Sequence, residues 1–308
     1  MNDAAMRALS SARTFIYRNA RPLEMARWQY HFEGGGKEAV LTALAAYQNA
    51  DGGFGHALEP DAWNPHSSPI QTWAATEILR EIGFADASHP IMQGILRYLT
   101  SGAHFSGAVW RNVIHSNNEF PHAPWWHSES ESASHHDYNP SACLAGFLVR
   151  FADGAGNQLG RRVAREAVDD YFARDLLGDM HTASCYIRLW RYLEDAGAAD
   201  VCDLDALKAR LMEQVKHNIT RDTAAWETGY ICKPSHFFND RASVFYAGNE
   251  EIAEYECAFI LRTQQDDGAW GIHWRWMDYP DAWAISKNWW KSSIAIQNLL
   301  YLKGMGQL

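Results

Sequence analysis

Carboxylates, imidazoles and indoles gather in a few polar stretches of this 308-residue chain, between segments that are nearly apolar. Paired carboxylates can act as a general acid and a general base, and histidine exchanges protons near neutral pH. The predicted catalytic candidates are Glu59, Asp61, His56, Asp137, His136 and His181.

Aromatic and polar side chains in the same stretches are predicted to bind a ligand. Indole faces can stack on sugar rings or attract a cation, and convergent polar groups around a concave mouth are the usual form of a binding site. Trp274 and Trp276 alternate in sequence, so they would either face a ligand together or seal the core. The predicted substrate-binding residues are Trp63, Trp125, Trp126, Trp226, Tyr230, His236, Trp274, Trp276, Asp278 and Trp283.

Each catalytic candidate also has a purely structural interpretation. Glu59 and Asp61 flank a proline in a loop, where carboxylates often cap a turn or face solvent. His136 follows another histidine in a serine-rich loop, which is compatible with simple exposure. His181 opens an apolar segment and is equally compatible with a buried, hydrogen-bonded imidazole.

Composition limits the kind of protein and partner. The formal net charge of −10 argues against nucleic acid and anionic membranes as partners. No stretch reaches the roughly 18 consecutive apolar residues of a membrane helix, and no signal-peptide core opens the chain. Five cysteines without a Cys-x-x-Cys pair indicate reduced thiols and a cytoplasmic protein. A small molecule or a saccharide is the expected ligand, and an oligomeric partner is left open.

Helices are the elements that must position these residues, because no convincing period-two strand occurs. Serine or asparagine followed by proline opens two nearly apolar helices, at Ser68 and Asn139. The glycine-rich stretch 153–160 is interpreted as a turn between helices. Further helices are expected at Lys37–Gln48, Arg161–Phe172, His181–Leu193, Leu204–His217 and Asn288–Leu302.

One glutamine-centred frame occurs at 43–55 and again at 259–271. In each copy an apolar pair, a glutamine, an aspartate, a glycine and an aromatic residue follow in the same order. A glutamine near a helix end can donate to carbonyls that lack helical partners, and Asp-Gly favours a turn. The frame therefore predicts a helix end, a stop and an aromatic ring folded back onto the helix.

The later copy of the frame resembles the QW repeat of the terpenoid cyclase and protein prenyltransferase superfamily at every position of that pattern. The earlier copy matches more loosely, with Ala43 in place of an aromatic residue and Phe54 in place of tryptophan. The resemblance implies an all-α fold, an (α/α) toroid of about six helical hairpins. It would form a single domain over residues 1–308, with the helices of 1–36 packed on the ring. The inner helices of such a ring run parallel, so their N-terminal ends share one mouth.

The catalytic motifs of that superfamily are absent from this sequence. The chain has neither the Asp-x-Asp-Asp motif of class II cyclases nor the Asp-x-Cys pair that holds zinc in prenyltransferase β subunits. Asp137, Cys143 and His181 have the wrong spacing for a zinc site. No cofactor is therefore expected, and zinc is the one metal to consider.

Three functions from different classes remain open. The first is a prenyltransferase-like or terpene cyclase-like enzyme that acts on an apolar or isoprenoid molecule in an aromatic-lined cavity. The second is a carbohydrate-active enzyme, a glycoside hydrolase or lyase, with a carboxylate pair in a polar site. The third is a non-catalytic binding protein with a vestigial site. The wall of the central cavity would distinguish these alternatives.

Overall fold

The computed structural model of the chain describes residues 3–129 and 137–308, so His136 lies outside the described residues. Within them the regular elements are helices and β-pairing is limited to isolated bridges, which confirms the predicted all-α class. No helix in this described part combines the length and the apolar composition that spanning a bilayer requires. The helices are α1 (Asp3–Asn19), α2 (Pro22–Phe32), α3 (Lys37–Ala45), α4 (Pro69–Glu81), α5 (Pro90–Thr100), η1 (His115–Glu119), η2 (Pro124–Trp126), α6 (Ser141–Phe151), α7 (Gly154–Ala173), α8 (Met180–Asp195), α9 (Leu204–Asn218), η3 (Thr223–Glu227), η4 (Pro234–His236), α10 (Glu250–Thr263) and α11 (Pro280–Gly304).

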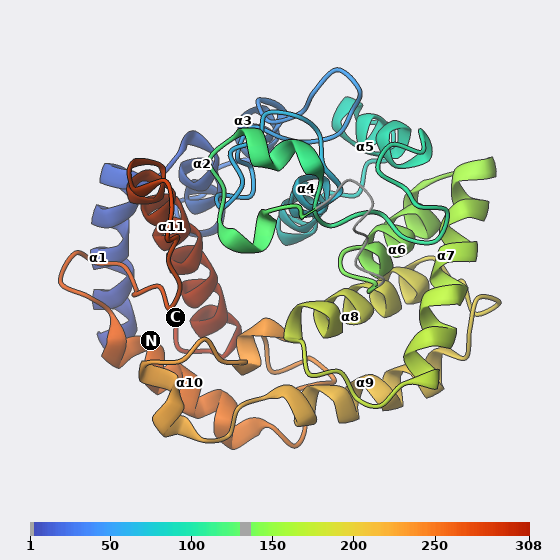
Figure 1. Cartoon of the computed structure of the whole chain (residues 1–308). Helices are drawn as coiled ribbons and strands as arrows, with labels where there is room; N and C mark the ends of the chain where they lie inside the picture. The colour runs from blue at the N-terminus through green and yellow to red at the C-terminus, as the bar shows by residue number, and fades with distance from the viewer. Residues whose placement is uncertain (1–2, 130–136) are drawn as a thin grey trace. The chain divides into compact units, whose positions relative to one another are not determined.

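The chain divides into two compact units. Unit 1 comprises Met1–Ala43 and Val215–Leu308, and unit 2 comprises Leu44–Gln214. Unit 1 therefore joins segments from both ends of the sequence, and α1 and α2 (blue in Figure 1) pack with α11 (red). The toroid that the resemblance implies stays a prediction.

Unit 2 is built around α6, a helix that is apolar on nearly every side. Its residues from Ser141 to Val149 are buried, and it packs against both α7 and α8 (Figure 1). A Cβ added to Gly160 of α7 would come within 2.7 Å of the Leu148 side chain, so glycine permits this close approach. Burial on all sides explains why the sequence of α6 shows no polar face.

Helices α6 and α8 run parallel. The Cys185 thiol of α8 donates to Oδ1 of Asn139, just before α6, at 3.6 Å. Further along, Gly146 of α6 lies against Leu189 of α8. Residue numbers rise together along the two helices, so their N-terminal ends lie at the same end of unit 2.

A desolvated carboxylate joins α4 to α8 in unit 2. Oε2 of Glu77 accepts from Nε of Arg188 at 2.8 Å and from a terminal nitrogen of Arg80 at 3.0 Å. Burial raises the pKa of Glu77, but the two guanidinium groups lower it further, to about 2. Loss of either arginine would leave a poorly solvated charge, so the network fixes the packing of the two helices.

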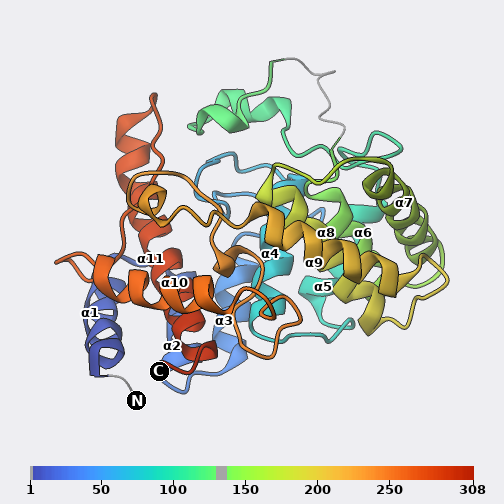
Figure 2. The ribbon, with the colours of Figure 1, turned by 90° about the horizontal axis from the view of Figure 1, so that it is seen from below.

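In unit 1 the long helix α11 packs against α1, α2 and α10, and Figure 2 shows α1 beside the lower part of α11. The Tyr301 hydroxyl of α11 donates to the carbonyl of Ala253 in α10 at 3.3 Å. Arg27 of α2 donates to the Ser293 hydroxyl of α11 at 3.3 Å. These buried contacts hold the chain's first helices to its last one.

Unit 2 contains the first glutamine frame. The Gln48 side-chain amide donates to the carbonyl of Gly52 at 2.9 Å and to that of Ile91 in α5 at 3.0 Å. The ring of Phe54 is fully buried, as the sequence predicts. The acceptors belong to the turn and to the next helix rather than to the glutamine's own helix, so the frame also ties two helices together.

Unit 1 contains the second frame with the same bonds. The Gln264 amide donates to the carbonyl of Gly268 at 2.8 Å and to that of Ala8 in α1 at 2.9 Å. The Trp270 ring is buried, and its Nε1 donates to the carbonyl of Ile260 at 2.8 Å. The helix end, the turn and the aromatic plug therefore recur in both units.

The structure corrects three predicted helix boundaries. Helix α7 includes nearly all of the glycine-rich stretch 153–160, which is helical because glycine serves close helix packing there rather than a turn. Helix α3 ends at Ala45, before Gln48 pairs with Phe54 across the turn. Helix α11 begins at Pro280, a residue that favours the first turn of a helix and that lies well before the predicted start.

Candidate functional site

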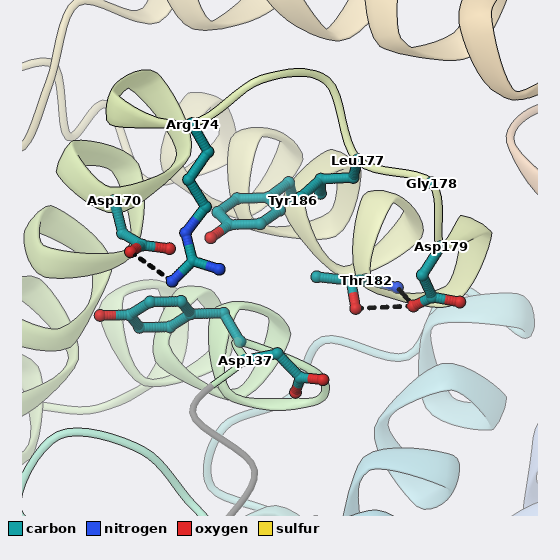
Figure 3. Close-up of a pocket in the computed structure, with 9 residues that line it drawn as sticks. Asp137, Asp170, Arg174, Leu177, Gly178, Asp179, Thr182 and Tyr186 are labelled. Carbon is teal, nitrogen blue, oxygen red and sulfur yellow. Dashed lines mark hydrogen bonds and ion pairs between the residues drawn. The ribbon is translucent and has the colours of Figure 1, made fainter.

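Unit 2 contains a cavity of about 190 Å³ between α7, α8 and the segment that leads into α6 (Figure 3). Three aspartates, one arginine and two tyrosines contribute to its walls, so the cavity has charged, hydroxyl and aromatic groups. Pockets for drug-sized ligands start near ~300 Å³, so this cavity suits a ligand of about one ring. Its lining residues are Asp137, Tyr138, Asp170, Arg174, Leu177, Gly178, Asp179, Thr182 and Tyr186.

Two of these carboxylates come from the N-terminal ends of the parallel helices α6 and α8. Oδ2 of Asp179 accepts from the backbone nitrogen and the hydroxyl of Thr182, both at 2.7 Å, and caps α8 (Figure 3). Oδ1 of Asp137 accepts from the backbone nitrogen of Asn139 at 3.2 Å. Local backbone donors therefore hold both acids at the cavity wall. Asp179 was not among the predicted catalytic residues, although its place before an apolar helix is the signal that identified Asp137.

Arg174 supplies the cation of the cavity. It donates to Oδ1 of Asp170 at 2.7 Å, one turn earlier on α7 (Figure 3). The hydrogen bond to Asp170 and the charge of that carboxylate raise the pKa of Arg174. Both side chains are substantially exposed, so the pair stabilises the fold little. The planar guanidinium retains donors that suit a hydroxyl or carboxylate of a ligand.

Two tyrosines form the aromatic part of the wall. Burial and the nearby charge of Asp170 raise the pKa of Tyr138, so its hydroxyl stays protonated at neutral pH. The Tyr186 hydroxyl donates to the carbonyl of Ala167 at 3.1 Å, and its ring stacks on that of Tyr171 with centroids 4.4 Å apart. Packing therefore fixes these rings, and they offer a firm surface to a ligand.

The loop with Glu59 and Asp61 lies in the same unit but does not contribute to this cavity. Both carboxylates are buried, and the Asp61 backbone nitrogen donates to Oε2 of Glu59 at 3.0 Å. His56 and Ala57 precede them with φ of 59° and 60°, a left-handed conformation that costs energy without glycine. The Ala123 nitrogen donates to the Asp61 carbonyl at 2.8 Å and fixes the loop. The two acids thus belong to a strained, well-packed loop rather than to a solvated one.

The remaining predicted residues of unit 2 lie nearer the surface. His56 is exposed, and its Nε2 lies 2.9 Å from Oδ1 of Asn49. His181 is exposed on the first turn of α8. Trp125 is 44% exposed, whereas Trp63 and Trp126 are half-buried. Exposed or half-buried rings of this kind remain accessible to a ligand.

Two histidines outside the predicted set form a pair beside the Glu59–Asp61 loop. Nε2 of His122 lies 3.0 Å from Nδ1 of His127, and the rings stack with centroids 5.3 Å apart. A bridge between Ala62 and His122 connects this pair to the loop. In an N–H···N bond of this kind one imidazole donates its proton to the unprotonated ring nitrogen of the other. Their irregular loop gave no periodic signal in the sequence.

Unit 1 holds the remaining aromatic candidates. Tyr230, 54% exposed, meets Trp274 edge to face with centroids 5.6 Å apart, and Trp274 meets Trp290 at 5.3 Å. Trp226 is fully buried, and its Nε1 donates to the carbonyl of Thr220 at 2.9 Å. The first three rings form a partly open surface, whereas Trp226 belongs to the core.

The other candidates of unit 1 do not converge on one point. Trp276 is buried beside the half-buried Trp283, with ring centroids 5.8 Å apart. Asp278 is exposed. Nδ1 of His236 accepts from the backbone nitrogen of Lys233 at 3.1 Å, so this imidazole closes a short turn.

A buried acid and a half-buried lysine lie next to this turn. The Glu256 carboxylate accepts from the backbone nitrogen and the hydroxyl of Ser235, at 2.9 and 2.6 Å. Burial raises the pKa of Glu256, whereas the Ser235 hydrogen bonds and the charge of Lys233 lower it. The effect of burial is larger, so the pKa is about 7. Nζ of Lys233 lies 4.6 Å from the Phe259 ring centroid, and burial lowers the pKa of this lysine.

Metal ligands do not cluster in the described part of the chain: residues 3–129 and 137–308 contain no group of three His, Cys, Asp or Glu side chains that is placed to hold an ion. The five cysteines are free thiols, and four of them are buried. No family model, no curated protein and no solved structure matches this chain, so the candidate site stands on its geometry alone.

Proposed function

We propose that the cavity of unit 2 is the active site of a carbohydrate-active enzyme, a glycoside hydrolase or lyase. The supporting observation is that Asp137 and Asp179, from the N-terminal ends of two parallel helices, line one small cavity together with Arg174. Glycosidases typically use two carboxylates that flank the scissile bond. A hydroxylated ring also offers many hydrogen-bonding groups to a wall of this kind.

The chain's own groups suggest the roles in the hydrolytic form of this reaction. Asp179 is the proposed base or nucleophile, because the two Thr182 donors fix its carboxylate. Asp137 is the proposed acid, which gives its proton to the leaving oxygen as the glycosidic C–O bond breaks. Arg174 would bind a hydroxyl or carboxylate of the sugar. Water then supplies the hydroxyl that completes the cleaved anomeric carbon.

Asparagine substitutions at the two acids test this proposal. Asparagine caps a helix about as well as aspartate, so D179N should change the free energy of unfolding by less than ~0.5 kcal/mol. Hydrolysis should fall by about 10²–10⁴-fold in D137N and in D179N. The matched control is D203N, because Asp203 caps the start of α9 in the same unit and does not line the cavity.

The readouts are thermal shift and release of reducing ends over a panel of oligosaccharides. A saccharide that stabilises the wild type should stabilise D203N equally. Full turnover in both D137N and D179N would remove these acids from the mechanism. The absence of any shift or cleavage with the saccharide panel would contradict the carbohydrate proposal.

An enzyme that acts on an apolar or isoprenoid molecule is the second candidate. The observation that favours it is the aromatic surface of Tyr230, Trp274 and Trp290 in unit 1, since such faces stabilise cationic intermediates. Isoprenyl diphosphates in the same thermal-shift panel test this candidate. Stabilisation that W274A removes and D179N leaves intact would favour it over the carbohydrate proposal. A protein that responds to neither class would favour the non-catalytic binding role.

A further inference from the structure

A second cavity, of about 360 Å³, lies in unit 1 between α1, the turn of the second glutamine frame and α11. Hydroxyl, amide and carboxylate groups line it, and one cation lies at its wall. The residues used below are Ser11, Thr14, Arg18, Asp266 and Asn288. The proposed carbohydrate site uses none of these residues, so this cavity is separate from it.

The equivalent place in unit 2 is filled by an arginine side chain. The glutamine bonds pair Ile91 of α5 with Ala8 of α1, so six residues further on Arg97 corresponds to Thr14. A terminal nitrogen of Arg97 donates to the carbonyl of Ala50, in the turn of the first frame, at 3.3 Å. In unit 2 the chain thus places its own guanidinium against this turn.

In unit 1 both residues of that contact differ, because a threonine replaces the arginine and an aspartate replaces the alanine. Thr14 is too short to reach the turn, and its hydroxyl points back to the carbonyl of Ser10 at 3.4 Å. Asp266 stands where unit 2 has Ala50, and its carboxylate forms no hydrogen bond or ion pair with any described residue. Asp266 is exposed, and the loss of a cation and the gain of an acid leave an open cavity whose charge suits a guanidinium group.

We propose that this cavity binds an alkylguanidinium group, carried by a free arginine-like molecule or by an arginine side chain of a peptide. Guanidinium binds a carboxylate through two parallel N–H···O bonds, and Asp266 offers that acceptor. Ser11 and Asn288 supply further oxygen acceptors at the wall. Arg18 would meet a carboxylate on the same ligand, so free arginine should bind more tightly than agmatine.

Calorimetry with four probes tests the proposal: arginine, agmatine, an acetylated and amidated arginine peptide, and 1,5-diaminopentane. The guanidinium probes should bind at one site per chain, and the diamine should bind at least tenfold more weakly. D266N should weaken binding at least tenfold, because the bidentate acceptor loses its charge. T14R should abolish binding by filling the cavity from within. D240N, an exposed acid elsewhere in unit 1, should bind as the wild type does.

The reverse exchange in unit 2 gives an independent test. R97T combined with A50D should open the equivalent cavity and raise the stoichiometry for arginine from one to two per chain. Binding of the peptide but not of free arginine would identify a protein partner as the source, and the opposite result would identify a small molecule. Absence of saturable binding by the wild type, unchanged binding by D266N, or equal binding of the diamine would overturn the proposal.

Discussion

In unit 2, Gln48 ties its turn to α5, a helix that follows it in the chain, whereas Gln264 in unit 1 ties its turn to α1, which precedes it by most of the sequence. The bonds and the glycine contacts are nevertheless the same. The docked helix presents a small residue to the turn in each case, Gly94 in α5 and Ser11 in α1. The frame therefore binds a docked helix whether that helix follows it or precedes it in the sequence. We call the turn of each frame, with the residues that contact the docked helix, the socket.

The two sockets differ in how much room they leave. A Cβ added to Gly53 would lie 2.6 Å from that of Ser67 and 2.7 Å from the Tyr98 ring. In unit 1 the same position is Ala269, which is fully buried without conflict. The frame's aspartate is bound by a serine hydroxyl in unit 2 and by the long side chain of Lys291 in unit 1. Ser67 is thus the residue that an added Cβ at Gly53 would meet, whereas Lys291 reaches Asp267 from α11 through a longer side chain.

Glycine-to-alanine changes at the two sockets should lower the unfolding free energy most, and by similar amounts in the two units. A Cβ would lie 2.1 Å from a carbonyl oxygen at Gly52 and 2.2 Å at Gly268, and φ is +95° and +93°. Overpacking and left-handed strain together should cost about 3–5 kcal/mol of unfolding free energy in G52A and in G268A. Urea denaturation measures this loss.

Gly102 provides the control for that measurement. Its φ is +83°, but no atom lies within 4 Å of an added Cβ. G102A should therefore show the conformational cost alone, about 1–2 kcal/mol. Equal losses in G102A and G52A would mean that close helix contact does not limit the socket.

The pH dependence of stability should separate Glu256 of unit 1, which is buried, from Glu77 of unit 2, whose side chain is 20% exposed. The pKa of Glu256 lies near 7, above its ordinary value of 4.5, so the folded state holds the proton more tightly. The resulting stability is present below about pH 4.5 and is lost as the pH rises through 7, by about 3 kcal/mol in all. Urea denaturation of E256Q should lack this loss between pH 4.5 and 7.

Glu77 should behave in the opposite sense. Its pKa lies near 2, below the ordinary 4.5, so its contribution is present above about pH 4.5 and is lost as the pH falls through 2. E77Q should flatten the acid limb of the stability curve, again by about 3 kcal/mol, and leave the interval from pH 5 to 7 unchanged. Identical pH profiles for E77Q and E256Q would contradict the contrast between the units.

Removal of the glutamine amide should have a smaller and matched effect in the two units. Q48L and Q264L each leave two carbonyl oxygens without the donor that they share. Each change should cost about 2 kcal/mol. Q93L is the control, because the exposed Gln93 bonds a single carbonyl and should lose less than ~0.5 kcal/mol. A large loss in one frame alone would show that the copies are not energetically equivalent.

The smallest effect is expected at the position where unit 2 has Arg97 and unit 1 has Thr14. R97A removes an exposed hydrogen bond of 3.3 Å and should lower the unfolding free energy by less than ~0.5 kcal/mol. Thermal unfolding of R97A beside T14A measures the difference. A loss above 1 kcal/mol would mean that the arginine holds α5 in place rather than filling space.

The sequence predicted the parts of this molecule that depend on local chemistry. The Asp-Gly turns, the Ser68 cap of α4 and the buried aromatic of each frame follow from residues close together in the chain. The predicted opening of α6 at Asn139 was wrong, because the N-cap there is Pro140 and no side chain caps the helix. Glu256 also carried a local signal, because it shares a helix face with Ile252 and Phe259, which are buried. That spacing could have identified it as an interior acid.

The remaining features depend on contacts between distant segments. Asp137 and Asp179 line one cavity because α6 and α8 lie parallel, and no short-range pattern specifies that geometry. Similarly, the acceptor in Ala8 for Gln264 comes from the other end of the chain. Glu59 and Asp61 were interpreted as loop residues, but their burial follows from packing against a segment some sixty residues away.

The composition of unit 1 from both ends of the sequence sets the order in which a ribosome can complete the molecule. At roughly 5–20 residues per second, helices α1 and α2 leave the exit tunnel tens of seconds before their partners in α10 and α11 are translated. Throughout that interval their apolar faces lack these partners, whereas the sequence of unit 2 is complete once Gln214 is translated, before α10 begins. Nascent chains stalled before α10 should therefore bind chaperones through α1 and α2, whereas the full-length chain should not.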